Sequence, residues 1–488
     1  MQTKLFINGD FVDGLAGNTV DVFDPHDGSV MAQVAEARAE DVDRAVRSAR
    51  DAFPAWADTP AMERGRLLLK LADTIEAHLD ELAQLESRDT GHPLRDSRIL
   101  DVPRTAAAFR YFGGLADKVQ GSVVPVEAGF LNYVLREPVG VVGQIVPWNF
   151  PLMFCSWKLG PALAAGNTVV MKPSELTPLS SLRLAELMVE IGVPPGVVNI
   201  LPGYGTTAGQ RIAEHPDVAK VSFTGSTATG RRIVEASAQN LARVHLELGG
   251  KGANVVFGDA DVDAAVGGSA FASFHNQGQA CIAGSRLVLH ESIADEFLAR
   301  FVELARSIRL GNPLDPSTEM GPLTSALHRD RVLGYVKIAT DEGGDVVTGG
   351  RAPDDATLAA GYYIEPTVVR ADWRSRVGQE EVFGPFVTVT TFRTDDEAEE
   401  IANGTDYGLG AGLWTRDLSR AHRLAKAFRS GMVWVNSYKR VNPGSPFGGV
   451  GRSGYGREMG FEVMQEYTKA KSVWVNIDAD IPPWYPRS

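Results

Sequence analysis

The chain has only two cysteines among its 488 residues. Two cysteines cannot form a disulfide framework, and a chain of this length does not need one to fold. The sequence also lacks an apolar run approaching the roughly 18–20 residues of a membrane-spanning helix. Its first ten residues show no secretory-signal pattern. We therefore expect a cytoplasmic protein without a membrane span.

An excess of positive charge is missing as well. The 48 Lys and Arg residues are outnumbered by 61 Asp and Glu residues, which leaves a net charge of −13. With no strongly basic stripe in the sequence, a nucleic-acid partner is not expected. The hydrophobic fraction of 44% is ordinary for a globular protein and excludes a disordered class. The length exceeds what one core usually supports, so we expect two or three domains.

Short apolar runs alternate with helical periodicities through the middle of the chain. The runs are typical of buried strands and lie at residues 139–146, 168–172, 197–201 and 220–223. This alternation, from about 139 to 256, predicts a parallel sheet covered by helices, and a second α/β series extends from about 260 to 448. Nearer the N-terminus, Asn8-Gly9 predicts a hairpin turn, and apolar spacing predicts helices over 39–57 and 62–90.

Cys281 lies in a segment that can present a thiol, Phe-His-Asn-Gln-Gly-Gln-Ala-Cys. A lone cysteine is more often a small core residue than a nucleophile, and we interpret Cys155 in that way. Two further motifs favour chemistry at Cys281. Glu247 lies in Leu-Glu-Leu-Gly-Gly-Lys, and Asn149 lies in Pro-Trp-Asn-Phe-Pro. A thiol, a carboxylate and a side-chain amide are the groups of a nucleophile, a base and an oxyanion donor.

Two segments are candidates for binding a nucleotide. Phe223–Gly230 follows an expected strand and begins a helix, so Gly225 permits a tight turn and Ser226 can cap a helix N-terminus that favours phosphate. The Gly-x-x-x-x-Gly spacing differs from the dinucleotide fingerprint, and an ordinary turn explains it equally well. Lys172 and Glu175 follow another strand, where a carboxylate can accept ribose hydroxyls and repel a 2′-phosphate. A solvated loop is an equal alternative for that segment.

Together these segments resemble the aldehyde dehydrogenase superfamily, in its non-acylating branch. The resemblance extends through nearly the whole chain. Its motifs are residues 147–151, 246–251, 276–281, 381–385 and 445–449. It implies that Cys281 is the nucleophile, that Glu247 is the general base, and that Asn149 and the backbone N–H of Cys281 form the oxyanion hole. Branches that transfer the acyl group to coenzyme A typically lack a carboxylate at the position of Glu247.

The resemblance also implies NAD as the cofactor, with NADP possible, and no metal. Lys172 and Glu175 would contact the adenosine ribose, and Glu381 would hold the nicotinamide ribose with Phe383 packed beside it. The full set of expected cofactor-binding residues is Ile145, Pro147, Trp148, Lys172, Ser174, Glu175, Gly205, Gly209, Phe223, Gly225, Ser226, Leu248, Glu381 and Phe383.

The substrate is the least determined part of the prediction. The resemblance implies that Trp157 lines the substrate tunnel and that Phe150, Phe154 and Phe447 add apolar walls, which favours an apolar, aromatic or heterocyclic aldehyde. His275 can either bind a polar substrate tail or pack in the core. The succinic semialdehyde branch carries arginines at the positions of Trp157 and His275, so its carboxylate clamp is missing here.

Three other interpretations remain open. Lys439 and Arg440 can bind the far carboxylate of a semialdehyde, although a charged pair is usually a solvated face. A thiol-dependent esterase and a binding protein on the same fold are alternatives of other classes.

The implied architecture has three parts. A Rossmann-like, doubly wound dinucleotide-binding domain comprises 1–119 and 139–250, and a second α/β domain, 251–450, carries the nucleophilic cysteine. Residues 120–138 and 467–488 would form a small oligomerisation sheet. The apolar alternation at 471–477 predicts an edge strand, and an unpaired edge is a liability. It can pair within its own subunit or across subunits, and the resemblance implies a homodimer or homotetramer.

Overall fold

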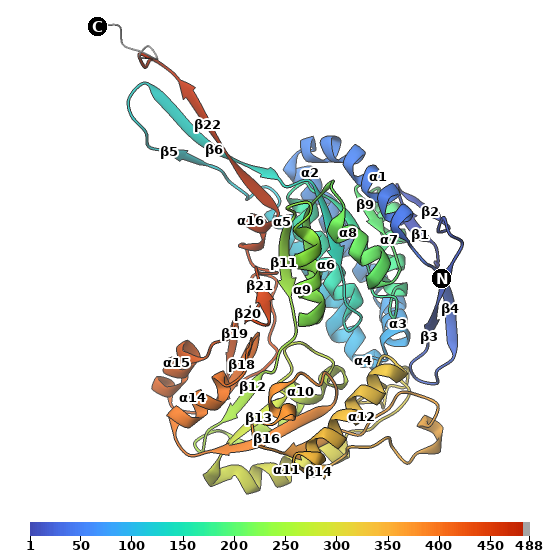
Figure 1. The fold of residues 1–488 in the computed structure, drawn as a ribbon, viewed down its shortest axis with the longest axis vertical. Helices are drawn as coiled ribbons and strands as arrows, with labels where there is room; N and C mark the ends of the chain where they lie inside the picture. The colour runs from blue at the N-terminus through green and yellow to red at the C-terminus, as the bar shows by residue number, and fades with distance from the viewer. Residues whose placement is uncertain (482–488) are drawn as a thin grey trace.

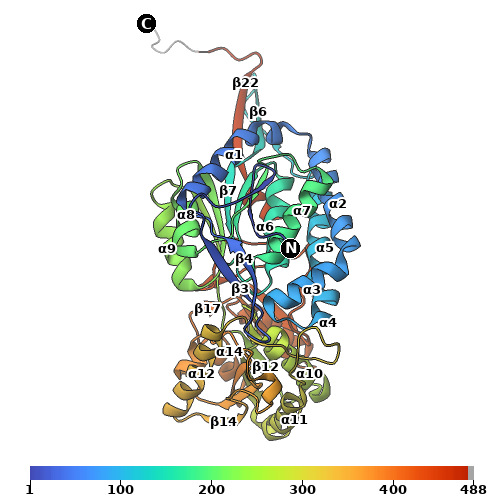
Figure 2. The ribbon, with the colours of Figure 1, turned by 90° about the vertical axis from the view of Figure 1, so that its right-hand side faces the viewer.

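A computed structural model describes residues 1–481 of the chain; the last part of the predicted oligomerisation segment, 482–488, lies outside the described residues. Two α/β bodies are stacked along the long axis, and a narrow β arm projects from the upper one (Figure 1). Each body contains one large sheet. The view turned by 90° separates the two bodies again and shows the arm above them (Figure 2). Among the described residues, no helix has the length and apolarity needed to span a bilayer.

The upper body is built on an eight-stranded sheet in the order β2-β1-β9-β8-β7-β10-β11-β21. The five central strands are parallel, because short β-branched runs alternate with helices that cross over between them. The strands are β1 (Leu5–Ile7), β2 (Asp10–Val12), β7 (Val141–Ile145), β8 (Thr168–Lys172), β9 (Val198–Ile200), β10 (Val218–Thr224), β11 (Arg243–Glu247) and β21 (Gly454–Tyr455). The prediction of a parallel sheet and an N-terminal hairpin is confirmed.

Helices cover both faces of this sheet. They are α1 (Ala39–Asp58), α2 (Ala61–Ala77), α3 (Leu79–Thr90), α4 (Leu94–Asp96), α5 (Val102–Leu115), α6 (Pro151–Ala164), α7 (Leu179–Ile191), α8 (Gln210–Glu214) and α9 (Thr227–Ser237). The predicted single helix over 62–90 is wrong. The backbone leaves the helical region at His78, whose ring nitrogen Nδ1 lies 2.8 Å from Glu81 Oε2, and the segment forms α2 and α3.

The lower body contains a seven-stranded sheet in the order β14-β15-β16-β13-β12-β18-β19. Its strands are β12 (Ala253–Val256), β13 (Arg286–His290), β14 (Asp345–Thr348), β15 (Thr367–Arg370), β16 (Phe386–Phe392), β18 (Gly410–Trp414) and β19 (Met432–Val435). Its main helices are α10 (Val262–Phe274), α11 (Ala294–Ser307), α12 (Ala326–Asp341), α13 (Arg376–Gln379), α14 (Asp395–Asn403) and α15 (Leu418–Ala427). Two short two-stranded sheets lie outside these large sheets: β3 (Thr19–Phe23) with β4 (Val30–Ala35), and β17 (Tyr407–Gly408) with β20 (Val450–Gly451).

The projecting arm is a three-stranded antiparallel sheet in which β6 (Phe130–Pro138) is central. It pairs with β5 (Ser122–Val124) on one side and with β22 (Thr468–Asn476), which follows α16 (Val463–Glu466), on the other. The C-terminal strand therefore pairs within its own chain along one edge. Trp474 and Val123 on this arm are 55% and 72% exposed, so apolar side chains face outward there.

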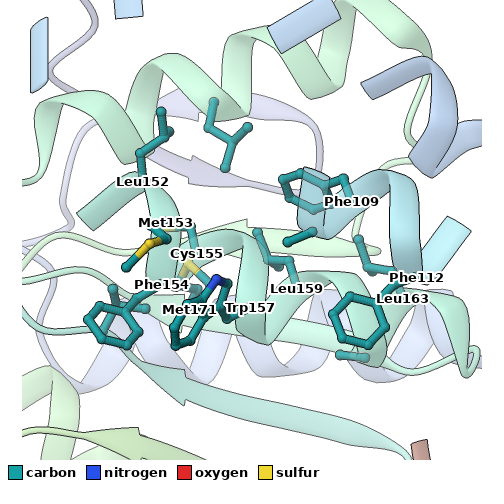
Figure 3. Packing of buried hydrophobic residues seen from close by; sticks show 14 of the residues in the cluster. Phe109, Phe112, Leu152, Met153, Phe154, Cys155, Trp157, Leu159, Leu163 and Met171 are labelled. Carbon is teal, nitrogen blue, oxygen red and sulfur yellow. The ribbon is translucent and has the colours of Figure 1, made fainter. Parts of the chain in front are cut away.

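Helix α6 runs through the centre of the upper core. All its residues are buried, because both of its sides face packed structure (Figure 3). Phe109 and Phe112 of α5 lie on one side of it. Cys155 is fully buried and its Sγ lies 3.3 Å from Ser181 Oγ. Burial raises the pKa of this thiol to about 12, which supports the interpretation of Cys155 as a structural residue.

Candidate active site

The backbone before Cys281 adopts an unusual conformation. After α10, the turn η3 (His275–Gly278) has positive φ angles of 56° at Asn276, 54° at Gln277 and 69° at Gly278. Such angles are uncommon for residues other than glycine. Gly278 is required, since a Cβ there would lie 2.0 Å from the carbonyl oxygen of Gly384. A strained segment of this kind persists only where its surroundings fix it.

Side-chain amides hold this turn in place. Gln277 Nε2 donates to the carbonyls of Gly91 and Pro322 at 2.8 Å each. Asn276 Nδ2 donates to the carbonyl of Asn149 at 2.8 Å, and Asn149 Nδ2 donates to that of Gln279 at 2.9 Å. These bonds lock the Asn149 segment to the cysteine loop across the two bodies. An amide has two N–H groups, and only one bond from the Asn149 amide is accounted for.

Cys281 lies where two cavities meet, and its side chain lines both. One cavity, here the cofactor-side cavity, encloses about 690 Å³ and is also lined by Asn149 and Glu247. The other, the substrate-side cavity, encloses about 430 Å³. The structure thus brings the three predicted catalytic side chains together around one space. That space has the size of a typical small-molecule site.

Glu247 ends β11 and is almost fully buried, with 2% of its surface exposed. Its Oε1 lies 3.1 Å from His245 Nε2, and its Oε2 has no hydrogen-bond partner among the described residues. Burial, reinforced by the neighbouring Glu458 carboxylate, raises the pKa of Glu247 well above its usual value. A carboxyl with a raised pKa and one free oxygen is suited to taking up a proton.

The electrostatic surroundings of Cys281 disfavour the thiolate. Burial raises the pKa of the Cys281 thiol, and the carboxylates of Glu381 and Glu247 raise it further. Lys439 acts in the opposite direction. Forming the nucleophilic thiolate therefore requires an added positive charge or a base that removes the proton.

Aromatic rings and close backbone contacts form the cofactor-side cavity. Trp148 packs edge-on against Phe383 and His328, with ring centroids 5.3 and 5.1 Å away. Glu381 Oε1 accepts from the backbone N–H of Gly250 at 2.8 Å, and burial raises the pKa of this carboxyl to about 7. Pro147, Gly225, Ser226 and Leu248, all predicted from the sequence, line the same cavity.

The turn into α9 has the features of an anion site. Ser226 is the N-cap residue, and its Oγ accepts from the backbone N–H of Thr229 at 3.2 Å. The N–H of Gly225 donates to the carbonyl of Glu247 at 3.0 Å, which ties this turn to the end of β11. A helix N-terminus favours negative charge, so this end of the cavity fits a phosphate group.

The other predicted cofactor residues lie at neighbouring strand ends and do not line the cavity. Lys172 ends β8, and its Nζ lies 3.0 Å from Glu175 Oε2 in an ion pair. Side-chain atoms of Ile145 and Lys172 each lie 3.8 Å from the position that a Cβ on Gly209 would occupy. The remaining members are Ser174 after β8, Gly205 in the turn before α8 and Phe223 in β10.

Apolar side chains, many of them aromatic, form most of the lining of the substrate-side cavity. Phe150, Phe154, Trp157 and Phe447 all line it, as predicted. Trp157 packs against Phe154 and Phe447 with ring centroids 5.2 and 4.9 Å away. The ring of His275 stacks on Phe150 at 6.2 Å, and His275 Nε2 has no hydrogen-bond partner within residues 1–481. Burial lowers the pKa of His275 well below its usual value, so this imidazole is neutral.

Two cationic side chains also line this cavity. Lys439 is 4% exposed, and its Nζ reaches only the carbonyls of Phe271 and His275, at 3.4 and 3.5 Å. Burial lowers the pKa of Lys439 to about 7. Arg104, from α5, is half-buried, and neither cation has a carboxylate partner within residues 1–481. Arg440, predicted to act with Lys439, is not among the residues that line this cavity, whereas Arg104 is, and a role for Arg440 stays a prediction.

Comparison with known proteins identifies the family. The sequence model of the aldehyde dehydrogenase family matches residues 11–473. The chain belongs to the aldehyde dehydrogenase family. It is 47% identical to human mitochondrial aldehyde dehydrogenase over 97% of this chain and 92% of that protein. The predicted family and α/β fold class are therefore confirmed.

Two solved structures are also similar. The crystal structure of PnpE from Pseudomonas sp. WBC-3 in complex with nicotinamide adenine dinucleotide is 69% identical, with a TM-score of 0.99 over 100% of both chains. The NAD⁺ complex of aldehyde dehydrogenase from Bacillus cereus is 44% identical, with a TM-score of 0.96 over 98% of this chain and 97% of that one.

Sequence reasoning missed several lining residues. They are Arg104, Met153, Phe271 and Val441 in the substrate-side cavity, and Thr224, Gly249, His328 and Arg331 in the cofactor-side cavity. Gly249 lies within a motif already recognised. His328 and Arg104 lie in ordinary helical segments far from any motif, and no local signal in the sequence marks them.

Proposed function

We propose that the protein oxidises an aldehyde to a carboxylic acid with NAD, through a covalent intermediate on Cys281. The observation that carries this proposal is the position of Cys281, whose side chain is shared by the two cavities beside Asn149 and Glu247. A nucleophile at such a junction can bond to a substrate on one side while a cofactor lies on the other. The family and its NAD-bound relatives support the same reaction.

The chemistry follows from the groups at this junction. The Cys281 thiolate adds to the aldehyde carbon, and the carbonyl oxygen becomes an oxyanion. The Asn149 amide and the backbone N–H of Cys281 stabilise that charge, and losing one such donor typically costs about 3 kcal/mol of barrier. Hydride loss then leaves a thioester on Cys281. Glu247 removes a proton from water, which hydrolyses the thioester and releases the acid.

NAD fits the cofactor-side cavity together with the end of β8 beside it, where Lys172 and Glu175 lie outside the cavity wall. The turn before α9 is suited to its pyrophosphate, Glu381 to its nicotinamide ribose, and the pair of Lys172 and Glu175 to its adenosine ribose. When bound, its ring supplies the hydride acceptor and a positive charge that favours the Cys281 thiolate. The negative charge of Glu175 favours NAD over NADP.

An apolar, aromatic or heterocyclic aldehyde is the substrate class we propose first. Five Phe and Trp side chains line the substrate-side cavity, and an aromatic substrate can form edge-on contacts with such rings. The neutral ring of His275 can bond a polar atom at the tail of such a substrate.

A semialdehyde is the second candidate, and one observation favours it. Lys439 and Arg104 line the substrate-side cavity, and neither has a carboxylate partner in the described part of the chain. A buried cation without an opposite charge is costly. A carboxylate at the far end of the substrate would supply that charge.

The test is a panel of aldehydes with NAD or NADP, followed by absorbance at 340 nm. Benzaldehyde and succinic semialdehyde represent the two substrate classes. Aldehyde-dependent formation of the reduced cofactor is expected, and it would exclude a thiol esterase and a binding protein. Ester hydrolysis without reduced cofactor for any aldehyde would contradict the proposal.

The exposed apolar residues of the arm also support a homo-oligomer. We propose that the free edges of β5 or β22 meet another subunit, in a dimer or tetramer. We also propose the three-part division of the chain, with one part for each main sheet, and a cytoplasmic location stays a prediction.

A further inference from the structure

A chain of buried polar side chains extends from Glu247 into the core, and its other members do not line either cavity. His245, two residues earlier on β11, is fully buried and its Nε2 lies 3.1 Å from Glu247 Oε1. Its Nδ1 lies 3.4 Å from Ser222 Oγ on β10. Ser222 accepts from Lys158 Nζ at 3.0 Å, and Lys158 forms an ion pair with Glu458. All five side chains are at most 2% exposed.

The ring of His245 has little freedom to turn. The backbone of Gly456, which has a φ of 87°, packs against it so closely that a Cβ there would lie 2.3 Å from His245 Cδ2. Strand pairing fixes the two flanking elements, since Ser222 is directly opposite His245 in the parallel register of β10 and β11. The imidazole is therefore held with its two nitrogens aimed at Ser222 and Glu247.

A neutral imidazole can form a hydrogen bond with Glu247 whether that carboxyl group is ionised or protonated. With Nε2 protonated, His245 donates to the carboxylate, and Nδ1 accepts from the Ser222 hydroxyl. With Nδ1 protonated, Nε2 accepts from the protonated carboxyl, and Nδ1 donates to Ser222 Oγ. A hydroxyl can take either role, so Ser222 supports both tautomers. Only Glu247 Oε1 is used in this contact, which leaves Oε2 free for the water that is activated.

We propose that His245 is a positioning residue that holds Glu247 in place through both protonation states and so accelerates loss of the acyl group from Cys281. This inference rests on the proposed function and deepens it. The charged groups around His245 are consistent with the neutral imidazole that this role requires. Burial is the main cause that holds the pKa of His245 well below its usual value, and the positive charges of Lys220, Lys158 and Arg457 lower it further, so the ring stays neutral.

The environment of Glu247 sets the expected pH dependence. The charged groups that act on Glu247 are Glu458, Lys158 and Arg457, and the neutral ring of His245 acts on it through a hydrogen bond. A hydrogen bond to an ionised group is stronger than one to its neutral form. The His245 N–H therefore stabilises the carboxylate and lowers the pKa of Glu247, and removing it should move the acid limb of acyl hydrolysis to higher pH.

The experiment follows the acyl group on Cys281 in the full-length enzyme mixed with NAD and benzaldehyde, quenched at intervals and analysed by peptide mass. His245→Leu removes both hydrogen-bonding nitrogens, and His245→Gln retains a donor and an acceptor. In the leucine variant, acyl loss should slow roughly ten- to hundredfold, and its acid limb should rise by about one pH unit. The glutamine variant should recover most of the rate. His422→Leu, on the exposed face of α15, is the matched control and should behave as the unmodified enzyme.

Several results would overturn the inference. One is a rate of acyl loss in His245→Leu that is within twofold of the rate in the unmodified enzyme, with the acid limb of the pH profile unchanged. Another is equal slowing in the leucine and glutamine variants. If the leucine variant does not fold, Ser222→Ala takes its place and should slow acyl loss about threefold with the same direction of pH shift, and an unchanged rate would contradict the role. Failure of the proposed function is distinct, because no acyl group would then appear on Cys281 in any variant, including the unmodified enzyme.

Discussion

The two cavities that meet at Cys281 are built in different ways. Strand ends, glycines and main-chain groups form much of the cofactor-side cavity, so its shape follows from a few short motifs. Side chains from α5, α6, α10 and the loop around Lys439 form the substrate-side cavity. The comparison teaches that a site made of backbone can be recognised from local sequence. A site assembled from distant side chains requires the fold.

The largest expected effect is a loss of aldehyde oxidation when Cys281, which lines both cavities, is replaced. Cys281→Ser should lower aldehyde oxidation at least about a thousandfold, because a hydroxyl is a far weaker nucleophile than a thiolate. Cys155→Ala is the matched control and should keep its activity, since that thiol lies in the core against Ser181. NADH formation measured at 340 nm gives both numbers. Comparable losses in the two variants would show that the junction is not the reaction centre.

The next largest effect distinguishes the role of Glu247 as the base from the role of Cys281 as the nucleophile. Glu247→Gln should slow steady-state turnover roughly a hundred- to a thousandfold, while the first turnover still produces a burst of NADH. In the unmodified enzyme the steady-state rate should rise with pH, because burial holds the pKa of Glu247 high and only the carboxylate accepts a proton. Stopped-flow absorbance across a pH series measures both. Loss of the burst together with turnover would contradict a role in thioester hydrolysis.

A smaller effect distinguishes the two substrate classes. Lys439→Met should raise KM for succinic semialdehyde roughly ten- to a hundredfold and leave that for benzaldehyde within about threefold, because a buried charged hydrogen bond is lost only with the carboxylate substrate. Lys426→Met, an exposed lysine on α15, is the control.

The charge of Lys439 also predicts a pH dependence. Its pKa is about 7, so its ammonium form is lost as pH rises through that value. KM for the semialdehyde should therefore increase above about pH 7, and that for benzaldehyde should not. Equal KM changes for both substrates would exclude a carboxylate-binding role.

The smallest expected effect is a change in the preference between NAD and NADP, and it tests the role of Glu175. Glu175→Gln should increase catalytic efficiency with NADP about tenfold relative to NAD, since it removes one negative charge near the 2′-phosphate. Glu190→Gln, exposed at the end of α7, should leave the ratio unchanged. Steady-state kinetics with both cofactors measures this ratio, and a preference for NADP already present in the unmodified enzyme would refute the assignment.

The contrast between the two cavities also explains which features could be predicted from the sequence. Apolar runs and Gly-rich turns predicted the parallel strands and the cap at Ser226, because both depend on neighbouring residues. The break at His78 was missed, since a helical periodicity continues across it. Arg440 was named because it adjoins Lys439 in the chain, and Arg104 was not considered. Only the packing of α5 against α6 shows which arginine reaches the cavity.

The central claim is that the aldehyde carbon becomes bonded to Cys281. The most direct measurement is the mass of the Cys281 peptide after Glu247→Gln enzyme is mixed with NAD and benzaldehyde and quenched within the first turnover. We predict an adduct on Cys281 with the mass of the aldehyde minus two hydrogens, as a thioester requires. A Cys281 peptide that stays unmodified while NADH is formed would contradict the account.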